Sequence, residues 1–208
     1  MGFSKLAYLA QVKRKINAGA PVSVGVFCTG NSDRSPLARA ALERRFRELG
    51  YGNVNVFSFG VTAQSGAEKG SSPRTVKHAA DMGYDLSRHR ATALVDALPN
   101  IKKADLIFGI SPSHLAFFAE AFADDVRYRG LSQDVLHKGW SLVGFANKKE
   151  WTRRWRLLGG GIARGLALKD PHGLPENEAG EKEWRRCLKK VESTAIAAAD
   201  RLVERKRD

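Results

Sequence analysis

The chain has 208 residues, 43% of them hydrophobic, and a formal net charge of +13. This length and apolar content are typical of one well-cored domain, so we predict a single domain over residues 1–208. The sequence has no apolar run long enough to span a bilayer, and residues 1–20 lack the apolar centre of a signal peptide. We therefore expect a cytoplasmic protein with no membrane partner.

The two cysteines, Cys28 and Cys187, are far apart, and no histidine has metal-ligand spacing with another ligand. A disulfide scaffold, a metal site and an organic cofactor are therefore not expected. Cys187 lies in a helical pattern and is interpreted as a small core residue. The basic charge is compatible with phosphorylated or acidic partners and equally with a solvated surface that has no dedicated partner; nucleic acid stays open as a partner but is not favoured.

The first segment, residues 1–21, is predicted to be an N-terminal helical extension. Its apolar residues Phe3, Leu6, Leu9 and Val12 recur at helical spacing, and a Gly and a Pro end the pattern. The face that carries these residues is expected to pack on the domain.

An apolar run at residues 22–27 is followed by a turn-rich loop and then by an amphipathic pattern at residues 37–49. This order predicts strand, loop and helix. Gly30 and Asn31 tolerate the backbone angles that turn successive N–H groups inward, and the helix adds its positive end. The loop is therefore predicted to bind an anion.

Cys28 at the base of this loop would lie under a bound phosphate, where the N–H dipoles and Arg34 favour its thiolate. Arg34 can bind two phosphoryl oxygens at once, and Ser35 can donate a hydrogen bond to the thiolate. A buried structural cysteine before a helix would also fit the bare spacing. The residues predicted to bind phosphate are Thr29, Gly30, Asn31, Ser32, Asp33, Arg34 and Ser35.

The rest of the chain alternates strand and helix patterns. The predicted elements are a strand at 54–59, a helix at 73–82, a helical turn at 93–98, a strand at 104–110, a helix at 112–122, a strand at 126–131 and a closing helix at 178–204. This alternation predicts an α/β three-layer sandwich: a four-stranded parallel sheet with helices on both faces and ligands at the carboxyl ends of its strands.

The stretch 132–169 is a basic insert that contains Trp140, Trp151 and Trp155. Aromatic residues among basic ones can bind single-stranded nucleic acid or phosphorylated segments. The preferred interpretation is a helical lid whose tryptophans pack on the domain while its basic residues face water.

Asp170 and Pro171 follow the insert. Proline fixes the backbone there, and the aspartate could reach over the phosphate loop to act as a general acid and then as a general base. Asp-Pro pairs are also common in ordinary turns.

The motifs resemble those of the low-molecular-weight protein tyrosine phosphatase family. The loop, Cys28-Thr-Gly-Asn-Ser-Asp-Arg-Ser-Pro36, is similar to the family signature Cys-x-Gly-Asn-x-Cys-Arg-Ser-Pro, and Ser58-Phe-Gly60, Gly83-Tyr-Asp-Leu-Ser-Arg-His-Arg-Ala91 and Asp170-Pro171 extend the likeness. The resemblance implies a phosphatase I-like fold and a metal-independent phosphatase of phosphoproteins, foremost of phosphotyrosine, acting through a phosphocysteine. Cys28 would be the nucleophile, Arg34 the phosphate clamp and Asp170 the general acid and base.

Several residues depart from the family pattern. Asp33 replaces a cysteine, and its charge would disfavour the thiolate and bound phosphate unless it pairs with a donor. Ser32 and His172 stand where members specific for phosphotyrosine carry apolar or aromatic residues, so a protein arginine phosphatase is an alternative. Ser111 replaces an aspartate, which puts in doubt a supporting interaction with His89.

Two other functions stay open. Asp33 and the basic insert favour a catalytically weak module that binds phosphate or nucleic acid. An arsenate reductase is less favoured, because it needs further cysteines and Cys187 is poorly suited to that role. The sequence identifies neither the physiological substrate nor the oligomeric state.

Overall fold

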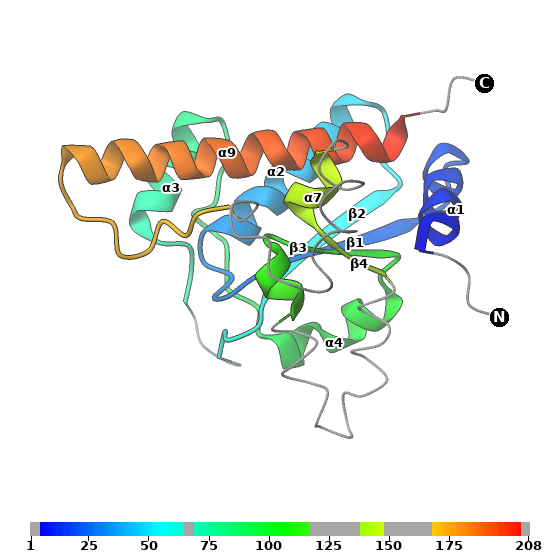
Figure 1. The fold of residues 1–208 in the computed structure, drawn as a ribbon, viewed down its shortest axis with the longest axis horizontal. Coiled ribbons are helices and arrows are strands. Elements are labelled where there is room, and N and C mark those ends of the chain that lie inside the picture. The colour runs from blue at the N-terminus through cyan, green and yellow to red at the C-terminus, as the bar shows by residue number, and fades with distance from the viewer. Residues whose placement is uncertain (1–4, 65–68, 117–137, 148–167, 205–208) are drawn as a thin grey trace, which may run out of the picture.

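A computed structural model describes residues 5–64, 69–116, 138–147 and 168–204 (Figure 1). The named elements in chain order are α1 (Lys5–Asn17), β1 (Val22–Cys28), α2 (Arg34–Glu48), β2 (Val54–Gly60), α3 (Pro73–Asp81), α4 (Leu94–Lys103), β3 (Leu106–Gly109), β4 (Gly139–Ser141), α7 (Leu142–Ala146) and α9 (Glu178–Val203).

The strands form one parallel sheet in the order β2-β1-β3-β4. The chain leaves β1 for β2 on one side and later returns to β3 on the other side. The carboxyl end of β1 is therefore a topological switch point, where open α/β sheets bind ligands. Cys28 is the last residue of β1 and lies opposite Gly60 of β2.

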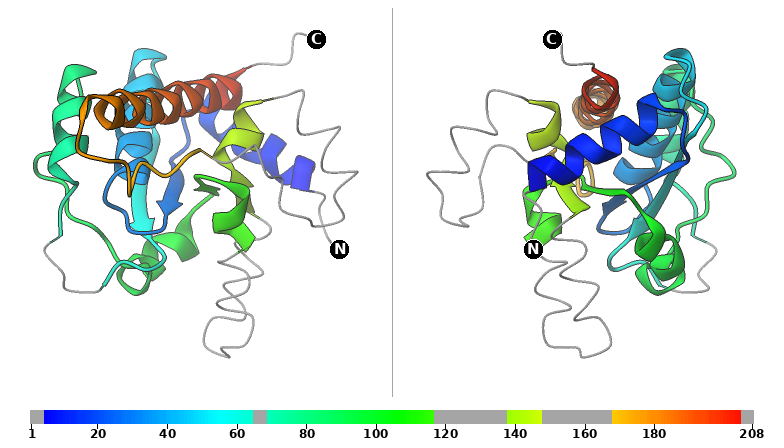
Figure 2. Two further views of the ribbon diagram at one scale, coloured as in Figure 1. Left: turned by 60° about the vertical axis from the view of Figure 1, so that its left-hand side comes forward. Right: turned by 90° about the vertical axis from the view of Figure 1, so that its right-hand side faces the viewer.

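Helices cover both faces of this sheet. α2 and α9 lie together over one face and α4 lies on the other, as Figures 1 and 2 show. Side chains on opposite faces of the sheet belong to two separate hydrophobic cores. Val24 and Val26 pack on the α2 and α9 side. Phe27, Phe59 and Ile107 pack on the α4 side. The predicted three-layer α/β fold is confirmed.

One helix is longer than predicted. The sequence predicts a short helical turn at 93–98, but α4 continues through Pro99 to Lys103. The buried face of α4 carries Leu94, Ala97 and Ile101. These side chains pack in the same core as Phe27, Phe59 and Ile107 of the sheet. Tertiary packing therefore outweighs the local cost of the proline.

The fourth strand lies later in the chain than expected. β4 is Gly139–Ser141, within the predicted insert, while residues 126–131 lie outside the described residues, as do Trp151 and Trp155. Trp140 of β4 is buried and packs edge to face on Phe145. This tryptophan therefore belongs to the core, as the packing interpretation of the insert expects.

The buried face of α1 differs from the prediction at Leu6, and the predicted Phe3 lies outside the described residues. Leu9, Val12 and Ile16 are buried, whereas Leu6 is 62% exposed. Lys5 completes the inner face, with its ammonium 4.6 Å from the centroid of the Trp140 ring. Burial lowers the pKa of Lys5 to about 8.

No helix within the described ranges combines the length and apolar content needed to cross a bilayer.

Candidate active site

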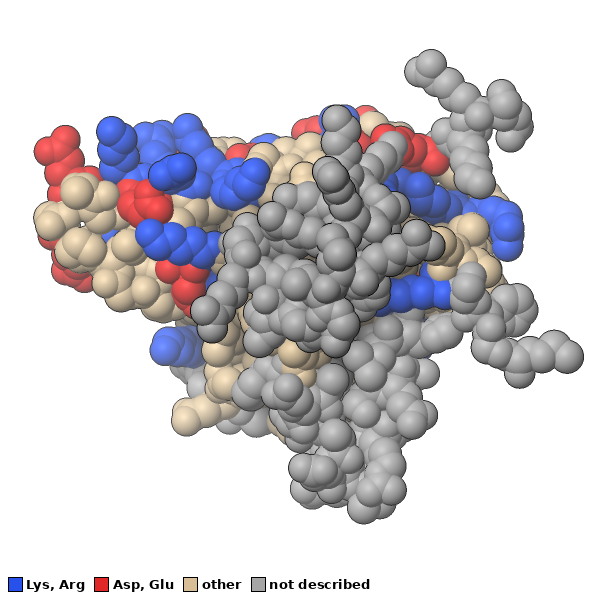
Figure 3. Space-filling view, in the orientation of Figure 1, with Lys and Arg blue, Asp and Glu red and all other residues tan. Residues whose placement is uncertain are grey.

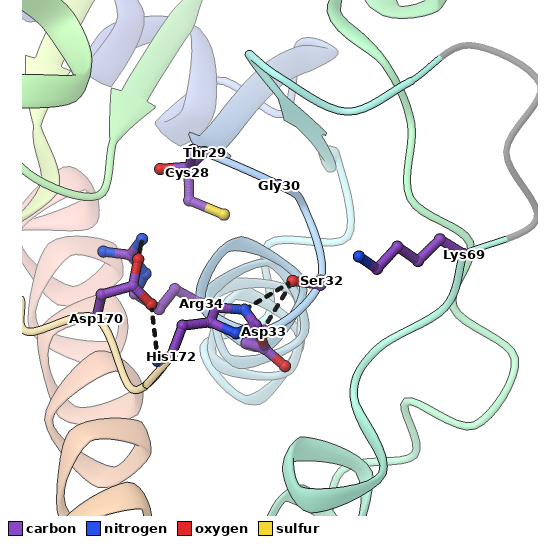
Figure 4. Close-up of a pocket in the computed structure, with 9 residues that line it drawn as sticks. All are labelled: Cys28, Thr29, Gly30, Ser32, Asp33, Arg34, Lys69, Asp170 and His172. Carbon is purple, nitrogen blue, oxygen red and sulfur yellow. Dashed lines mark hydrogen bonds and ion pairs between the residues drawn. The ribbon is translucent and has the colours of Figure 1, made fainter. Parts of the chain in front are cut away.

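A hollow lies at the carboxyl end of β1 (Figure 4). It brings together Cys28 from the end of β1, Arg34 from the start of α2 and Asp170 from the segment before α9. These are the three residues that the sequence predicts to be catalytic. The full lining is Cys28, Thr29, Gly30, Ser32, Asp33, Arg34, Lys69, Asp170 and His172.

Asn31 holds the loop in shape. Its φ of 53° lies in the left-handed region, which asparagine tolerates better than most residues. The side chain is fully buried; its amide nitrogen donates to the hydroxyls of Ser35 (2.9 Å) and Ser58 (3.0 Å), and its amide oxygen accepts from the backbone N–H of Thr92 (2.8 Å). One side chain therefore ties the loop to β2 and to the segment before α4.

The loop carbonyls are bound from outside the hollow. The Thr29 carbonyl accepts from the Thr62 N–H at 2.9 Å, and the Asn31 carbonyl accepts from His89 Nε2 at 2.7 Å. In a trans peptide the N–H points opposite to the C=O, so the amides of Gly30 and Ser32 point toward the hollow. Two amides of the loop therefore have the inward orientation that an anion-binding loop requires.

Gly60 lets β2 approach the loop closely. A Cβ atom at this position would lie 2.8 Å from the Asn31 nitrogen, from the Gly30 carbonyl carbon and from the Thr29 oxygen. These contacts are with backbone, which cannot move aside without reshaping the loop. Gly60 is therefore required for the loop conformation.

Ser35 is placed to support the Cys28 sulfur. Its hydroxyl lies 3.1 Å from Cys28 Sγ, and both residues are buried. The same hydroxyl oxygen accepts from the Asn31 amide, so its own hydrogen is free to donate to sulfur. This arrangement can stabilise a thiolate.

Arg34 is buried and bonded to the segment before α9. Its Nη2 donates to the carboxylate of Asp170, and its Nη1 donates to the Leu168 carbonyl at 3.4 Å. Asp170 also accepts from the backbone N–H of His172 at 3.1 Å, and its side chain is 42% exposed. The predicted clamp and the predicted general acid are therefore partners in this structure.

Asp33 is 2% exposed and bound by several donors. Its carboxylate accepts from the Ser72 hydroxyl at 2.5 Å and lies 2.6 Å from His172 Nε2. Burial raises the pKa of Asp33, but hydrogen bonds from Ser72 and Thr75, the charge of His172 and the Ser32 hydroxyl together bring the pKa below its ordinary value. The carboxylate of Asp33 is thus paired with donors, which reduces its repulsion of a thiolate and of a bound phosphate.

His89 and Ser111 have different hydrogen-bond partners. His89 bonds to the Asn31 carbonyl, while Ser111 bonds to His114 at 2.6 Å. Burial is the main cause that lowers the pKa of His89. Because the Asn31 carbonyl can only accept, His89 carries its proton on Nε2.

Sequence reasoning did not identify Lys69, His114 or Ser72 as part of the site. Lys69 projects toward the Ser32 side of the loop (Figure 4). Ser72 caps α3, and a serine before Pro73 is a recognisable helix start, but nothing local shows that it also binds Asp33.

The described residues contain no group of three or more His, Cys, Asp and Glu side chains that could hold a metal ion. Cys187 is buried on α9, and burial is the main cause that raises the pKa of its thiol. Its placement agrees with the predicted core role.

Residues 23–130 match the family model described as low molecular weight phosphotyrosine protein phosphatase. The chain is 40% identical over 82 residues to a Ralstonia solanacearum protein named "Probable low molecular weight protein-tyrosine-phosphatase EpsP". The match covers 39% of this chain and 50% of that protein, so the chain spans about half the length of the curated relatives it matches.

Solved structures extend the likeness over most of the chain. A YwlE mutant from Bacillus subtilis is 23% identical, with a TM-score of 0.61, over 88% of this chain and 99% of that one. The YwlE arginine phosphatase from Geobacillus stearothermophilus is 24% identical, with a TM-score of 0.59, over 88% and 93%. At these identities the comparison establishes a shared fold.

Proposed function

The chain belongs to the low molecular weight phosphotyrosine protein phosphatase family, and we propose that it hydrolyses phosphomonoesters of phosphoproteins through a phosphocysteine intermediate. One observation carries the proposal. Cys28, Arg34 and Asp170 line the same hollow, beneath a loop whose amides point inward.

In the first step, the Cys28 thiolate attacks phosphorus as the bond to the leaving oxygen breaks. Arg34 releases the Asp170 carboxylate and binds two phosphoryl oxygens instead. It then stabilises the charge that spreads over these oxygens. The freed Asp170 carboxylate takes up a proton from solvent and then gives it to the leaving oxygen, which departs as the neutral hydroxyl. The Asp170 side chain is partly exposed at the hollow, so it can leave Arg34 without opening the core.

In the second step, water attacks phosphorus and the bond from phosphorus to sulfur breaks. Asp170 takes a proton from that water. The Ser35 hydroxyl, 3.1 Å from the sulfur, stabilises Cys28 as it leaves as a thiolate. The protein returns to its starting state with inorganic phosphate in the loop.

The test is hydrolysis of p-nitrophenyl phosphate against pH, with a chelator present. Cys28→Ser is expected to reduce turnover to background, and Asp170→Ala to lower kcat about 10²- to 10⁴-fold. Cys187→Ser is the matched control and should retain wild-type kinetics. Turnover that survives Cys28→Ser would refute the proposal.

Phosphotyrosine is the substrate that we propose first, but the rim of the hollow favours phosphoarginine as a second candidate. Among the described residues, the lining contains no aromatic ring except the imidazole of His172. Ser32, Lys69 and His172 offer polar contacts instead. A phosphotyrosine ring would therefore gain little from stacking here.

Two peptides of identical sequence, one with phosphotyrosine and one with phosphoarginine, separate these substrates. A higher kcat/KM for phosphotyrosine supports the first proposal. A higher value for phosphoarginine assigns the polar rim to that substrate.

The basic surface supports phosphorylated partners. Figure 3 shows Lys and Arg side chains gathered over the N-terminal half of α9, where Lys182, Arg185 and Lys189 are exposed. Such a surface attracts acidic substrates at low ionic strength.

The chemistry requires reduced Cys28, which fits the cytoplasmic location proposed from the sequence.

A catalytically weak phosphate-binding module is less favoured, because the carboxylate of Asp33 is paired with Ser72 and His172. An arsenate reductase would need a second reactive thiol, and burial raises the pKa of Cys187. Neither alternative is supported by a specific contact in the hollow.

A further inference from the structure

Thr29 follows Cys28 directly and lines the hollow. Its side chain is exposed, unlike the buried residues that follow Gly30 in the loop. Its hydroxyl oxygen lies 3.2 Å from Nε2 of His114, a residue that neither the family motifs nor the proposed mechanism uses. The direction of this hydrogen bond decides what the Thr29 hydroxyl can offer a ligand.

The tautomer of His114 is fixed by its other nitrogen. Nδ1 lies 3.1 Å from the backbone N–H of Ser111, which can only donate. Nδ1 is therefore an acceptor, and the proton of the neutral ring is on Nε2. That proton is donated to the Thr29 oxygen.

His114 stays neutral over the working range of a phosphatase. The ring is buried and packs edge to face on Phe27. Burial, followed by the positive charge of Arg34, lowers the pKa of His114 to about 4 against the opposing effect of Asp170. The assigned tautomer therefore persists at neutral pH.

The hydroxyls of Ser111 and Ser113 agree with this tautomer of His114. Ser111 Oγ lies 2.6 Å from His114 Nδ1 and 2.6 Å from the hydroxyl of Ser113. Because Nδ1 accepts, Ser111 donates to it and accepts from Ser113. The hydrogen bonds thus run one way, from Ser113 through Ser111 and His114 to Thr29.

The Thr29 oxygen accepts from His114, so its own hydrogen must point elsewhere. Within the described part of the chain, His114 is the one residue that hydrogen-bonds this hydroxyl. Thr29 lines the hollow together with Cys28 and Arg34, so this hydrogen can be directed at a ligand there. A phosphoryl oxygen bound over Cys28 could accept this hydrogen.

We propose that His114 is a positioning residue that, held by Ser111, turns the Thr29 hydroxyl into the hollow as a donor to a phosphoryl oxygen. The proposal rests on the proposed phosphatase function and adds an oriented side-chain donor to the backbone amides and Arg34. A donor fixed in advance needs no reorientation when charge develops in the transition state.

A double-mutant cycle tests the proposal. Thr29→Val removes the hydroxyl at nearly constant shape, and His114→Leu removes its orienting donor. Each is expected to lower kcat/KM about 10- to 100-fold and to raise the inhibition constant of inorganic phosphate, as expected for a lost hydrogen bond to a charged group. Combined, they should lower kcat/KM no further than Thr29→Val alone, because His114 acts through Thr29.

A merely structural role for His114 predicts a different result. The two losses would then multiply in the double variant, and this outcome overturns the proposal. Thr194→Val is the matched control; it removes a buried hydroxyl that bonds to the Lys190 carbonyl on α9 and should leave kcat/KM unchanged.

His114→Gln keeps the test valid if His114→Leu does not fold. The glutamine amide can still donate to Thr29, so at least part of the activity should return. A folded His114→Gln protein as impaired as Thr29→Val overturns the proposal.

The outcome also separates this proposal from the phosphatase function. If the wild type does not turn over, the phosphatase function fails, and calorimetric binding of inorganic phosphate to the wild type, the two single variants Thr29→Val and His114→Leu and their double variant replaces kcat/KM. Weaker binding in Thr29→Val, with no further loss in the double variant, still supports the oriented donor. Equal binding by all four proteins contradicts it.

Discussion

The two sides of the hollow are held by different forces. The phosphate loop at residues 28–35 is buried except at Thr29 and Gly30, and Asn31 ties it by short hydrogen bonds to Ser58 and His89. Opposite it, the segment 170–174 is held by charged contacts, and the side chains of Asp170 and His172 are 42% and 57% exposed. Buried hydrogen bonds resist salt and pH, whereas exposed ion pairs do not. The loop is therefore pre-organised, and the segment that carries the proposed general acid is adjustable.

The segment 170–174 has its firmest anchors beyond Asp170. Arg74 donates to the Leu174 carbonyl at 3.1 Å, and its guanidinium lies 4.1 Å from the Trp184 ring centroid. A Cβ atom at Gly180 would overlap the Pro175 carbonyl, so α9 and the segment lie in direct backbone contact. The carboxyl-terminal end of the segment is thus fixed, while Asp170 at its other end is held by its charged contact with Arg34.

The largest effect is expected from damage to the loop side. Gly60→Ala would push a methyl group into the backbone at Thr29, Gly30 and Asn31. A displacement on the order of 1 Å in a catalytic group can cost about 10²-fold, and we expect at least that loss in kcat/KM for p-nitrophenyl phosphate.

Gly52→Ala is the matched control, because an added Cβ there meets nothing. Near-wild-type kinetics in Gly60→Ala would contradict the view that the loop is pre-organised by its contact with β2.

An intermediate effect is expected where the two sides meet, at Asp33. Asp33→Asn should lower the free energy of unfolding by about 1–2 kcal/mol at pH 7, because the hydrogen bonds and His172 favour the charged form. A lowered folded pKa stabilises the protein above the unfolded value of about 3.9, and the gain is lost as pH falls through the folded value. Urea unfolding at pH 7 and pH 3 should show the difference between the two proteins shrinking at pH 3. An equal difference at both pH values would rule out this origin.

A smaller effect is expected from His172→Ala. It removes the contact with Asp33 but leaves the bonds from Ser72. Because His172 is largely exposed, kcat/KM should fall only a few-fold at low salt and approach the wild-type value at about 1 M salt. A loss that salt does not change would show that the segment is held by packing instead.

The smallest effect is expected from Lys69→Ala. Its exposed ammonium faces the hollow and would attract a phosphate dianion before binding (Figure 4). KM for a phosphopeptide should rise about two- to five-fold at low ionic strength, with kcat unchanged. Lys182→Ala, an exposed lysine on α9, is the control. A fall in kcat would instead place Lys69 in the chemical step.

The sequence predicts the loop side well, because its groups are close together in the chain. Cys28 and Arg34 are joined by one loop, and the strand before and the helix after it are clear from hydrophobic spacing. Asp170 could be proposed only with the help of the family resemblance, since an Asp-Pro pair by itself indicates no more than a turn.

Long-range contacts explain what the sequence did not predict. The partners of Asp33 come from Ser72 and His172, which no local pattern connects to the loop. The strand β4 has only Gly, Trp and Ser, so its place is fixed by parallel pairing with β3 rather than by a strand pattern. The link from His114 to Thr29 likewise depends on the end of β3 lying beside the end of β1.

The most direct test of the proposed chemistry is to trap the intermediate on Asp170→Ala with p-nitrophenyl phosphate. Nitrophenolate leaves without a proton, so the first step should proceed, while loss of the general base slows hydrolysis of the phosphocysteine. Rapid quenching and mass spectrometry should then find one phosphoryl group on Cys28, together with a burst of nitrophenolate. Continued turnover with no phosphoryl group on Cys28, or with the group on another residue, would contradict the account.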